Sequence, residues 1–197
     1  MLRLAGTRVN PNTNGPHLQF YSVSMMLKDV ADGRETEVTM PAGSKITGVQ
    51  WSPDGKHIAF GNVTPNGVEL WIADTTTGKA VKVKNVYVNT AFGGFDWENS
   101  NELTASLVPT GRGPAPAYQN LTPNEPSIQE TSGRRGALVT FQDLLKSPND
   151  EKLFDYYAGS QLAVIDVNGK VRNVGSPAIF DNTSFSPDGK YVLVSRI

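Results

Sequence analysis

The chain has 197 residues, of which 38% are hydrophobic and 19% charged, enough for one ordinary hydrophobic core. Its 18 basic and 19 acidic residues give a net charge of -1, with no long run of either sign, which argues against nucleic acid and anionic membranes as partners. The lack of cysteine excludes disulfides and thiolate metal sites. No apolar run could span a membrane and no targeting segment is recognisable, which leaves the compartment open between cytosol, periplasm, secretion and an organelle.

Short β-branched runs separated by glycine and proline predict a mainly β chain. Residues 17–40 are expected to form two strands around the Asp32-Gly33 turn, the outer half of a propeller blade. Residues 46–84 are expected to form a complete four-stranded blade, and its first turn is Ser52-Pro-Asp-Gly55. In that turn proline presets φ, aspartate bonds its own backbone and glycine takes a positive φ, which together favour a tight hairpin.

A second blade is predicted from residues 92–108 together with 161–174. The interval from Trp51 to Trp97 supports this division, because it matches a four-stranded blade of about 40 to 45 residues. The insertion at 109–160 is expected to begin as an irregular, proline-rich surface loop and to end in two short helices. Apolar residues at helical spacing place those helices at 140–146 and 151–157, with Ser147-Pro148 breaking the run.

The tight turn returns as Ser186-Pro-Asp-Gly189, so residues 179–197 are expected to be the inner half of a blade. The fold prediction is therefore a partial β-propeller of four-stranded antiparallel blades, a fragment of a longer propeller, because a closed ring usually needs about four blades or more. Unpaired strands at both ends are templates for pairing. We expect the two half blades to pair either within one molecule or in a strand-exchanged dimer.

Several stretches resemble one peptidase family in the same order along the chain. They are Lys45-Ile46, Trp51-Ser-Pro-Asp-Gly-Lys-His57, Trp71-Ile-Ala-Asp74, Arg112-Gly113, Thr140-Phe-Gln-Asp-Leu-Leu-Lys146, Leu153-Phe-Asp-Tyr-Tyr-Ala158 and Ser160-Gln-Leu162. This pattern is similar to the N-terminal propeller of glutamyl endopeptidases, in the prolyl oligopeptidase family of serine peptidases. The resemblance covers nearly the whole chain.

The resemblance implies a propeller that gates and positions peptide substrates, with a preference for acidic residues, for a separate α/β-hydrolase domain of the same parent chain. The 197 residues contain no Gly-x-Ser-x-Gly nucleophile elbow, so no catalytic residue is assigned and the chain itself is expected to be inactive. The alternative is a TolB-like or WD-like propeller that serves as a protein-binding scaffold. The repeat fits both hypotheses equally.

Two insertion arginines, Arg112 and Arg134, are the candidate substrate-binding residues, because a guanidinium fork suits the carboxylate of an acidic peptide. A solvated loop is the competing interpretation of both. His17 and His57 lack metal-ligand spacing, so no metal or other cofactor is expected, and His57 is interpreted as a surface strand residue. Asp54 and Asp188 are interpreted as turn residues. The large aromatic residues Trp51, Trp71, Trp97 and Phe185 are predicted to pack between blades.

Overall fold

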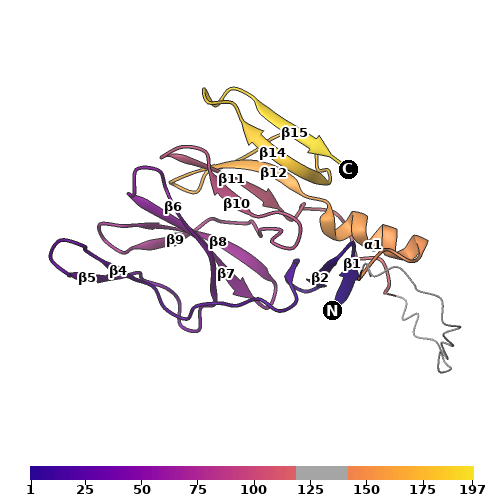
Figure 1. Ribbon diagram of the computed structural model, residues 1–197, viewed down its shortest axis with the longest axis horizontal. Coiled ribbons are helices and arrows are strands. Elements are labelled where there is room, and N and C mark those ends of the chain that lie inside the picture. The colour runs from indigo at the N-terminus through magenta and orange to yellow at the C-terminus, as the bar shows by residue number, and fades with distance from the viewer. Residues whose placement is uncertain (119–141) are drawn as a thin grey trace, which may run out of the picture.

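The computed structural model describes residues 1–118 and 142–197 of the chain (Figure 1). The described part is mainly β, and its strands form antiparallel sheets of two to four strands. The mainly β fold class with four-stranded antiparallel blades is confirmed. No helix in these two ranges has the length and apolar character needed to cross a bilayer.

The first blade, named blade 1, consists of β6 (Ile46–Trp51), β7 (His57–Thr64), β8 (Gly67–Asp74) and β9 (Ala80–Lys82), hydrogen-bonded in that order. The turn between β6 and β7 forms as predicted. Ser52 N donates to the His57 carbonyl at 2.9 Å, and Gly55 has a φ of +70°, which a residue with a Cβ rarely adopts.

The second blade, named blade 2, consists of β10 (Phe95–Trp97), β11 (Glu102–Leu107), β12 (Gln161–Asp166) and β13 (Val171–Asn173). The long insertion lies between β11 and β12. These two strands nevertheless pair without a break, from Glu102 opposite Asp166 to Leu107 opposite Gln161. The insertion therefore leaves the sheet at one end and returns there.

The two blades stack face to face around a shared core. This core contains fully buried side chains from both blades and from the segment between them: Ala59, Leu70, Val88, Leu103, Ala163 and Ile165. Two hydrogen bonds join the innermost strands: Gln50 Nε2 donates to the Phe95 carbonyl at 2.9 Å, and Trp97 Nε1 donates to the Gln50 carbonyl at 3.3 Å. Burial of these aliphatic side chains stabilises the interface by about 25 cal/mol per Å² of apolar surface removed from water.

The N-terminal residues contain a small sheet that the sequence analysis did not predict. It consists of β1 (Leu2–Leu4), β2 (Thr7–Asn10) and β3 (Gly15–Pro16). The half blade expected at residues 17–40 is reduced to β4 (Met26–Lys28) and β5 (Glu35–Glu37). Residues 17–25 are not a continuous strand. His17 N donates to the Arg8 carbonyl, Ser22 forms an isolated bridge with Ile46, and the Met25 carbonyl accepts from Val38 N.

One helix, α1 (Pro148–Ala158), is present among the described residues of the insertion. The prediction of a helix at 140–146 is wrong over residues 142–146, and residues 140 and 141 lie outside the described ranges. Ser147-Pro148 starts a helix rather than breaking one: the Ser147 side chain caps the Asp150 N–H, and proline fits the first helical turn because its missing N–H has no partner there.

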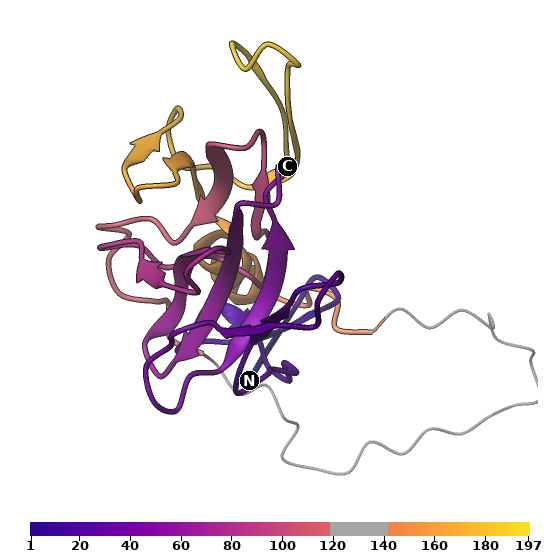
Figure 2. The same cartoon turned by 90° about the vertical axis from the view of Figure 1, so that its left-hand side faces the viewer.

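The C-terminal hairpin consists of β14 (Phe180–Phe185) and β15 (Val192–Arg196), which pair only with each other. In Figures 1 and 2 this hairpin and the β4–β5 hairpin lie on opposite sides of the two stacked blades. The half blades therefore do not pair with one another within one molecule.

Candidate functional site

Arg112 lies on the segment that leaves β11, close to the C-terminal end of α1. Its Nη1 donates to Asn14 Oδ1 at 2.9 Å and to the Tyr156 carbonyl at 3.1 Å. The guanidinium also stacks on the Tyr156 ring, with Cζ 4.1 Å from the ring centroid. Both acceptors are neutral, and no carboxylate of residues 1–118 or 142–197 forms an ion pair with Arg112. The positive charge is positioned but not neutralised by these residues.

Two buried asparagines fix the backbone around Arg112. Asn14 Nδ2 and Asn89 Nδ2 both donate to the Tyr157 carbonyl, at 3.0 and 2.8 Å, and Asn89 Nδ2 also donates to Ser160 Oγ at 2.9 Å. Asn14 is 2% exposed and Asn89 is completely buried. These bonds join the N-terminal sheet, the segment between the blades and the end of α1 into one polar cluster, which holds Arg112 on a rigid base.

The tyrosine pair Tyr156 and Tyr157 at the end of α1 also holds the Arg112 segment in place. The Tyr156 hydroxyl donates to the Gly113 carbonyl at 2.9 Å, which ties the Arg112 segment to α1 a second time. Tyr157 packs edge-on against Tyr156 at 5.0 Å between centroids. Burial raises the pKa of Tyr157, and the neighbouring Tyr156 adds to that effect while Arg112 opposes it. A pKa raised above its usual value keeps the Tyr157 phenol neutral at physiological pH, so it does not neutralise the Arg112 charge.

A cavity of about 650 Å³ opens beside Arg112, between the Arg112 segment, α1 and the residues that precede β14. Its lining combines apolar and charged groups: Arg112, Pro114, Lys152, Asp155, Tyr156 and Ile179. Two basic side chains and one carboxylate line it. The cavity therefore suits a peptide that carries an acidic side chain next to an apolar one, because an arginine fork binds a carboxylate through two parallel hydrogen bonds.

The second predicted arginine, Arg134, lies outside the described residues. The structure therefore brings only Arg112 into the candidate site. The surrounding groups Asn14, Asn89 and Lys152 were missed by the sequence analysis. Asparagines distant in sequence carry no local signal of a shared contact, and Lys152 sits on a helix whose first turn was misplaced.

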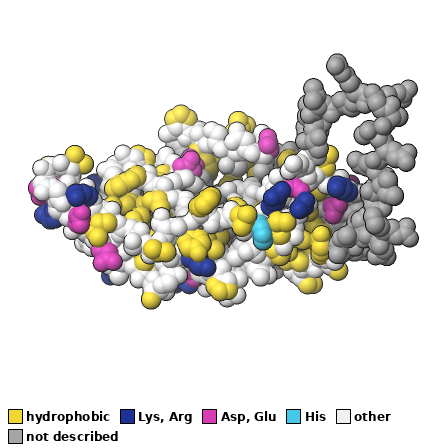
Figure 3. All heavy atoms as spheres, turned by 60° about the horizontal axis from the view of Figure 1, so that its bottom comes forward, with side chains coloured by type: hydrophobic (Ala, Val, Ile, Leu, Met, Phe, Trp, Pro, Cys, Tyr) yellow, Lys and Arg dark blue, Asp and Glu magenta, His cyan; other side chains and the backbone are white. Residues whose placement is uncertain are grey.

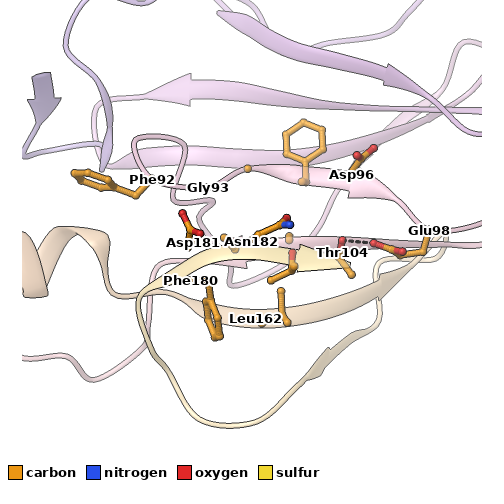
Figure 4. Close-up of a pocket in the computed structure, with 14 residues that line it drawn as sticks. Phe92, Gly93, Asp96, Glu98, Thr104, Leu162, Phe180, Asp181 and Asn182 are labelled. Carbon is orange, nitrogen blue, oxygen red and sulfur yellow. Dashed lines mark hydrogen bonds between the residues drawn. The ribbon is translucent and has the colours of Figure 1, made fainter. Parts of the chain in front are cut away.

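A different cavity, of about 300 Å³, lies between blade 2 and β14 (Figure 4). Its charged lining residues are the carboxylates Asp96, Glu98 and Asp181, and no basic side chain lines it. The Thr104 hydroxyl donates to Glu98 Oε1 at 2.7 Å across its wall. An acidic peptide would be repelled here, so the cavity beside Arg112 is the better candidate.

The turn aspartates have the structural role predicted for them. Asp54 Oδ1 accepts from the Ser52 hydroxyl at 2.8 Å and from Lys56 N at 3.1 Å, and Asp188 repeats both bonds at 2.6 and 3.2 Å. The Lys56 N–H bond, followed by the Ser52 hydroxyl, holds the pKa of Asp54 below its usual value. Both carboxylates are occupied within their own turns.

Two predictions for ring side chains need correction. His57 begins β7 as predicted but is half-buried rather than a surface residue: its ring lies 6.3 Å from the Trp97 ring across the blade interface, and its Nδ1 is buried. Trp97 packs against the core between the blades as predicted, but Trp51 is 57% exposed. Trp51 instead lines an open cavity together with residues of the β4–β5 hairpin, among them Leu27 and Thr36.

No protein-family model matches the chain. Two curated proteins, each described as a probable chloroplastic glutamyl endopeptidase, match over 99% of it: the protein from Oryza sativa is 36% identical and the one from Arabidopsis thaliana 38% identical. The chain is homologous to part of a glutamyl endopeptidase. It spans 22% of the length of each of these glutamyl endopeptidases.

A solved structure supports the fold assignment independently. It comes from a study of two prolyl endopeptidases, aligns with 98% of this chain and 26% of its own, and gives a TM-score of 0.51 at 16% identity. At this identity the similarity concerns the fold alone. The glutamyl endopeptidase-like chain thus shares its β architecture with a peptidase structure over nearly its whole length.

Proposed function

We propose that the chain is the non-catalytic propeller region of a serine peptidase, where it gates and positions peptide substrates for a separate α/β-hydrolase domain. The observation that carries this proposal is the match to two probable glutamyl endopeptidases over 99% of the chain but only 22% of their length. The chain contains no nucleophile elbow, so the serine, aspartate and histidine would come from elsewhere in the parent protein.

The mechanism is one of access and orientation. A propeller beside a hydrolase site restricts entry to short or extended peptides, and groups at its rim hold the substrate in a reactive geometry. Arg112 is the group best suited to this task, because it is fixed through Nη1 by Asn14 and Tyr156 and lines an open cavity. The guanidinium nitrogens other than Nη1 would bind the carboxylate of a peptide, which would favour substrates with acidic side chains. Arg134 remains a second candidate, as the sequence analysis proposed.

The first test of the proposal is the sequence of the reading frame that contains this chain. A Gly-x-Ser-x-Gly elbow downstream of Ile197, followed by aspartate and histidine in that order, supports the peptidase. A frame that ends shortly after Ile197 or continues only as further blades supports the scaffold alternative. The purified 197 residues should not cleave a glutamyl ester. Cleavage that a serine-directed reagent blocks would contradict the assignment of a non-catalytic region.

The role of Arg112 is tested in the whole peptidase. Arg112→Ala should raise KM for a glutamyl substrate about tenfold relative to its glutaminyl counterpart, which corresponds to the loss of one charge-assisted contact, while kcat changes little. Lys170→Ala, a change on the exposed turn between β12 and β13, is the matched control. An unchanged preference for glutamate in Arg112→Ala would remove Arg112 from the proposal. In this proposal the partners of the chain are the hydrolase domain of the same parent protein and peptide substrates, and a strand-exchanged dimer is a further state of the isolated chain.

A further inference from the structure

Asn14 lies behind Arg112, in the turn that joins β2 to β3, and each of its polar groups has a partner. Its backbone N donates to the Asn10 carbonyl at 3.0 Å, and its own carbonyl accepts from Ala91 N at 3.2 Å. Its side chain connects Arg112 with Tyr157, through Oδ1 to the first and through Nδ2 to the second. Its φ of +54° is one that asparagine adopts more readily than most residues with a Cβ. The backbone and the amide of Asn14 are therefore both fixed in place.

The two neighbours of the Asn14 amide determine which way it faces. The guanidinium of Arg112 can only donate hydrogen bonds and needs an oxygen, whereas the Tyr157 carbonyl can only accept them and needs an N–H. Asparagine offers both groups on one short side chain. Ionised aspartate has the same shape but offers acceptors alone. Asparagine can therefore bind Arg112 and Tyr157 together without bringing a charge to the site.

Two other arginines of the chain are held in a different way. Arg3 and Arg8 share one carboxylate, that of Asp143, at 3.4 and 3.2 Å, and the Asp143 side chain is only 7% exposed. Figure 3 also shows basic side chains (dark blue) beside acidic ones (magenta) on the surface that it presents. An arginine that joins two segments of this fold can thus be paired with a carboxylate. Arg112 joins segments as well, but it does so through a neutral amide.

The remaining contacts of Arg112 preserve its charge too. The guanidinium lies 4.1 Å from the Tyr156 ring centroid and 5.7 Å from that of Tyr157. An aromatic face attracts a cation through its quadrupole and leaves the charge intact. The two rings, the Tyr156 carbonyl and the Asn14 amide therefore hold a full positive charge beside the cavity that Arg112 lines. Of these groups, Asn14 is the one that an isosteric substitution would make anionic.

We propose that Asn14 is the positioning residue that sets the charge preference of the Arg112 site. It binds Nη1 through a neutral oxygen, so the positive charge stays available for the carboxylate of a peptide. A carboxylate at position 14 would pair with the guanidinium from behind, and glutamate and glutamine peptides would then be bound equally. This role rests on the proposed function of the chain, and it makes the preference for acidic peptides depend on a residue that does not line the cavity.

Asn14→Asp in the whole peptidase tests the role of Asn14, with paired substrates that differ only in a glutamate or a glutamine. The KM values of the pair should differ about tenfold in the wild type and less than about twofold in Asn14→Asp. The KM for the glutaminyl substrate and kcat for both substrates should change little, whereas a loss of packing would affect both substrates alike. Asn12→Asp is the matched control, because it adds the same charge to an exposed position of the same turn, and it should keep the wild-type ratio.

Asn14→Gly tests the same role in a variant that buries no carboxylate. An aspartate at position 14 would face the Tyr157 carbonyl and could destabilise the fold, whereas glycine adopts a φ of +54° freely. Asn14→Gly removes one anchor of Arg112 but adds no charge. The ratio of KM values should therefore fall to about threefold, between those of the wild type and Asn14→Asp.

The pattern of ratios separates a failure of this role from a failure of the proposed function. A wild type that does not prefer glutamate would overturn both. A wild-type preference that survives in folded Asn14→Asp, or in Asn14→Gly where the aspartate variant does not fold, would overturn the role of Asn14 alone. Equal losses in Asn14→Asp and Asn14→Gly would show that the anchor matters and its neutrality does not, and a loss in Asn12→Asp would show that any nearby charge suffices. Either of these results also overturns the role of Asn14.

Discussion

The polar cluster around Tyr157 shows how single residues position the candidate site. Asn14, Asn89 and Arg112 come from three distant segments, and they converge on the carbonyls of Tyr156 and Tyr157. The cost of leaving a buried polar group without a partner makes such a cluster specific: each member is needed by the others. The same bonds that stabilise the fold therefore hold the Arg112 charge at the cavity.

Asn89→Ala should lower the free energy of unfolding by about 1–3 kcal/mol, because it removes donors to Tyr157 and Ser160 from a completely buried site. Urea unfolding followed by circular dichroism measures the change. Asn101→Ala on an exposed turn is the control and should stay within about 0.5 kcal/mol of the wild type. Equal stability of the two variants would contradict the structural role of Asn89.

Glu69 should make the stability of blade 1 depend on pH. Burial acts to raise the pKa of Glu69, but hydrogen bonds from Trp71, Lys82 and Asn62 outweigh it and hold the pKa below its usual value of 4.5. The ionised side chain thus stabilises the fold above the unfolded pKa, and this contribution is lost as the pH falls through the lower folded value.

The measurement for Glu69 is urea unfolding of the wild type and Glu69→Gln from neutral pH to pH values below 4.5. The wild type should be the more stable of the two at neutral pH, and the difference should shrink as the pH falls. A difference that stays constant over this range would show that the carboxylate charge makes no contribution.

At the scale of the elements, the blades follow from local sequence and the attachments to them do not. The Ser52-Pro-Asp-Gly55 turn and the strands beside it are encoded within a few residues, and the interval from Trp51 to Trp97 places blade 2 one repeat later, so both four-stranded sheets could be predicted. The strands β1 to β3 have two to four residues each and owe their pairing to distant contacts, so no pattern marked them. The start of α1 was misplaced because Ser147-Pro148 was interpreted as a helix break rather than as a cap followed by a proline in the first turn.

Ser147→Ala should destabilise α1 by about 1 kcal/mol, because the hydroxyl oxygen accepts from Asp150 N at 3.2 Å and caps the helix. Hydrogen exchange of the amides at 150–153 should become faster, while the amides of β7 and β8 should be unaffected. Ser176→Ala in an exposed turn is the control. Unchanged exchange at the start of α1 would mean that proline alone sets the helix start.

At the scale of the whole molecule, the flank of blade 1 and the hairpin β14–β15 both expose large apolar side chains, among them Trp51, Tyr191 and Leu193. Among the described residues, β14 and β15 pair only with each other. Sequence analysis could count the half blades but could not decide between pairing within a molecule and pairing between molecules, because that choice depends on their separation in space. The end of the blades that carries α1 is different, since there the buried asparagines and Arg112 form a hydrogen-bonded cluster within one chain.

The central claim is that the propeller region itself recognises acidic peptides through Arg112. Fluorescence anisotropy with two labelled peptides that differ only in a glutamate or a glutamine tests it most directly. The wild-type chain should bind the glutamate peptide about tenfold more tightly, and Arg112→Ala should bind both peptides equally. Equal binding of the two peptides by the wild type, or a preference for glutamate that survives in Arg112→Ala, would contradict the claim.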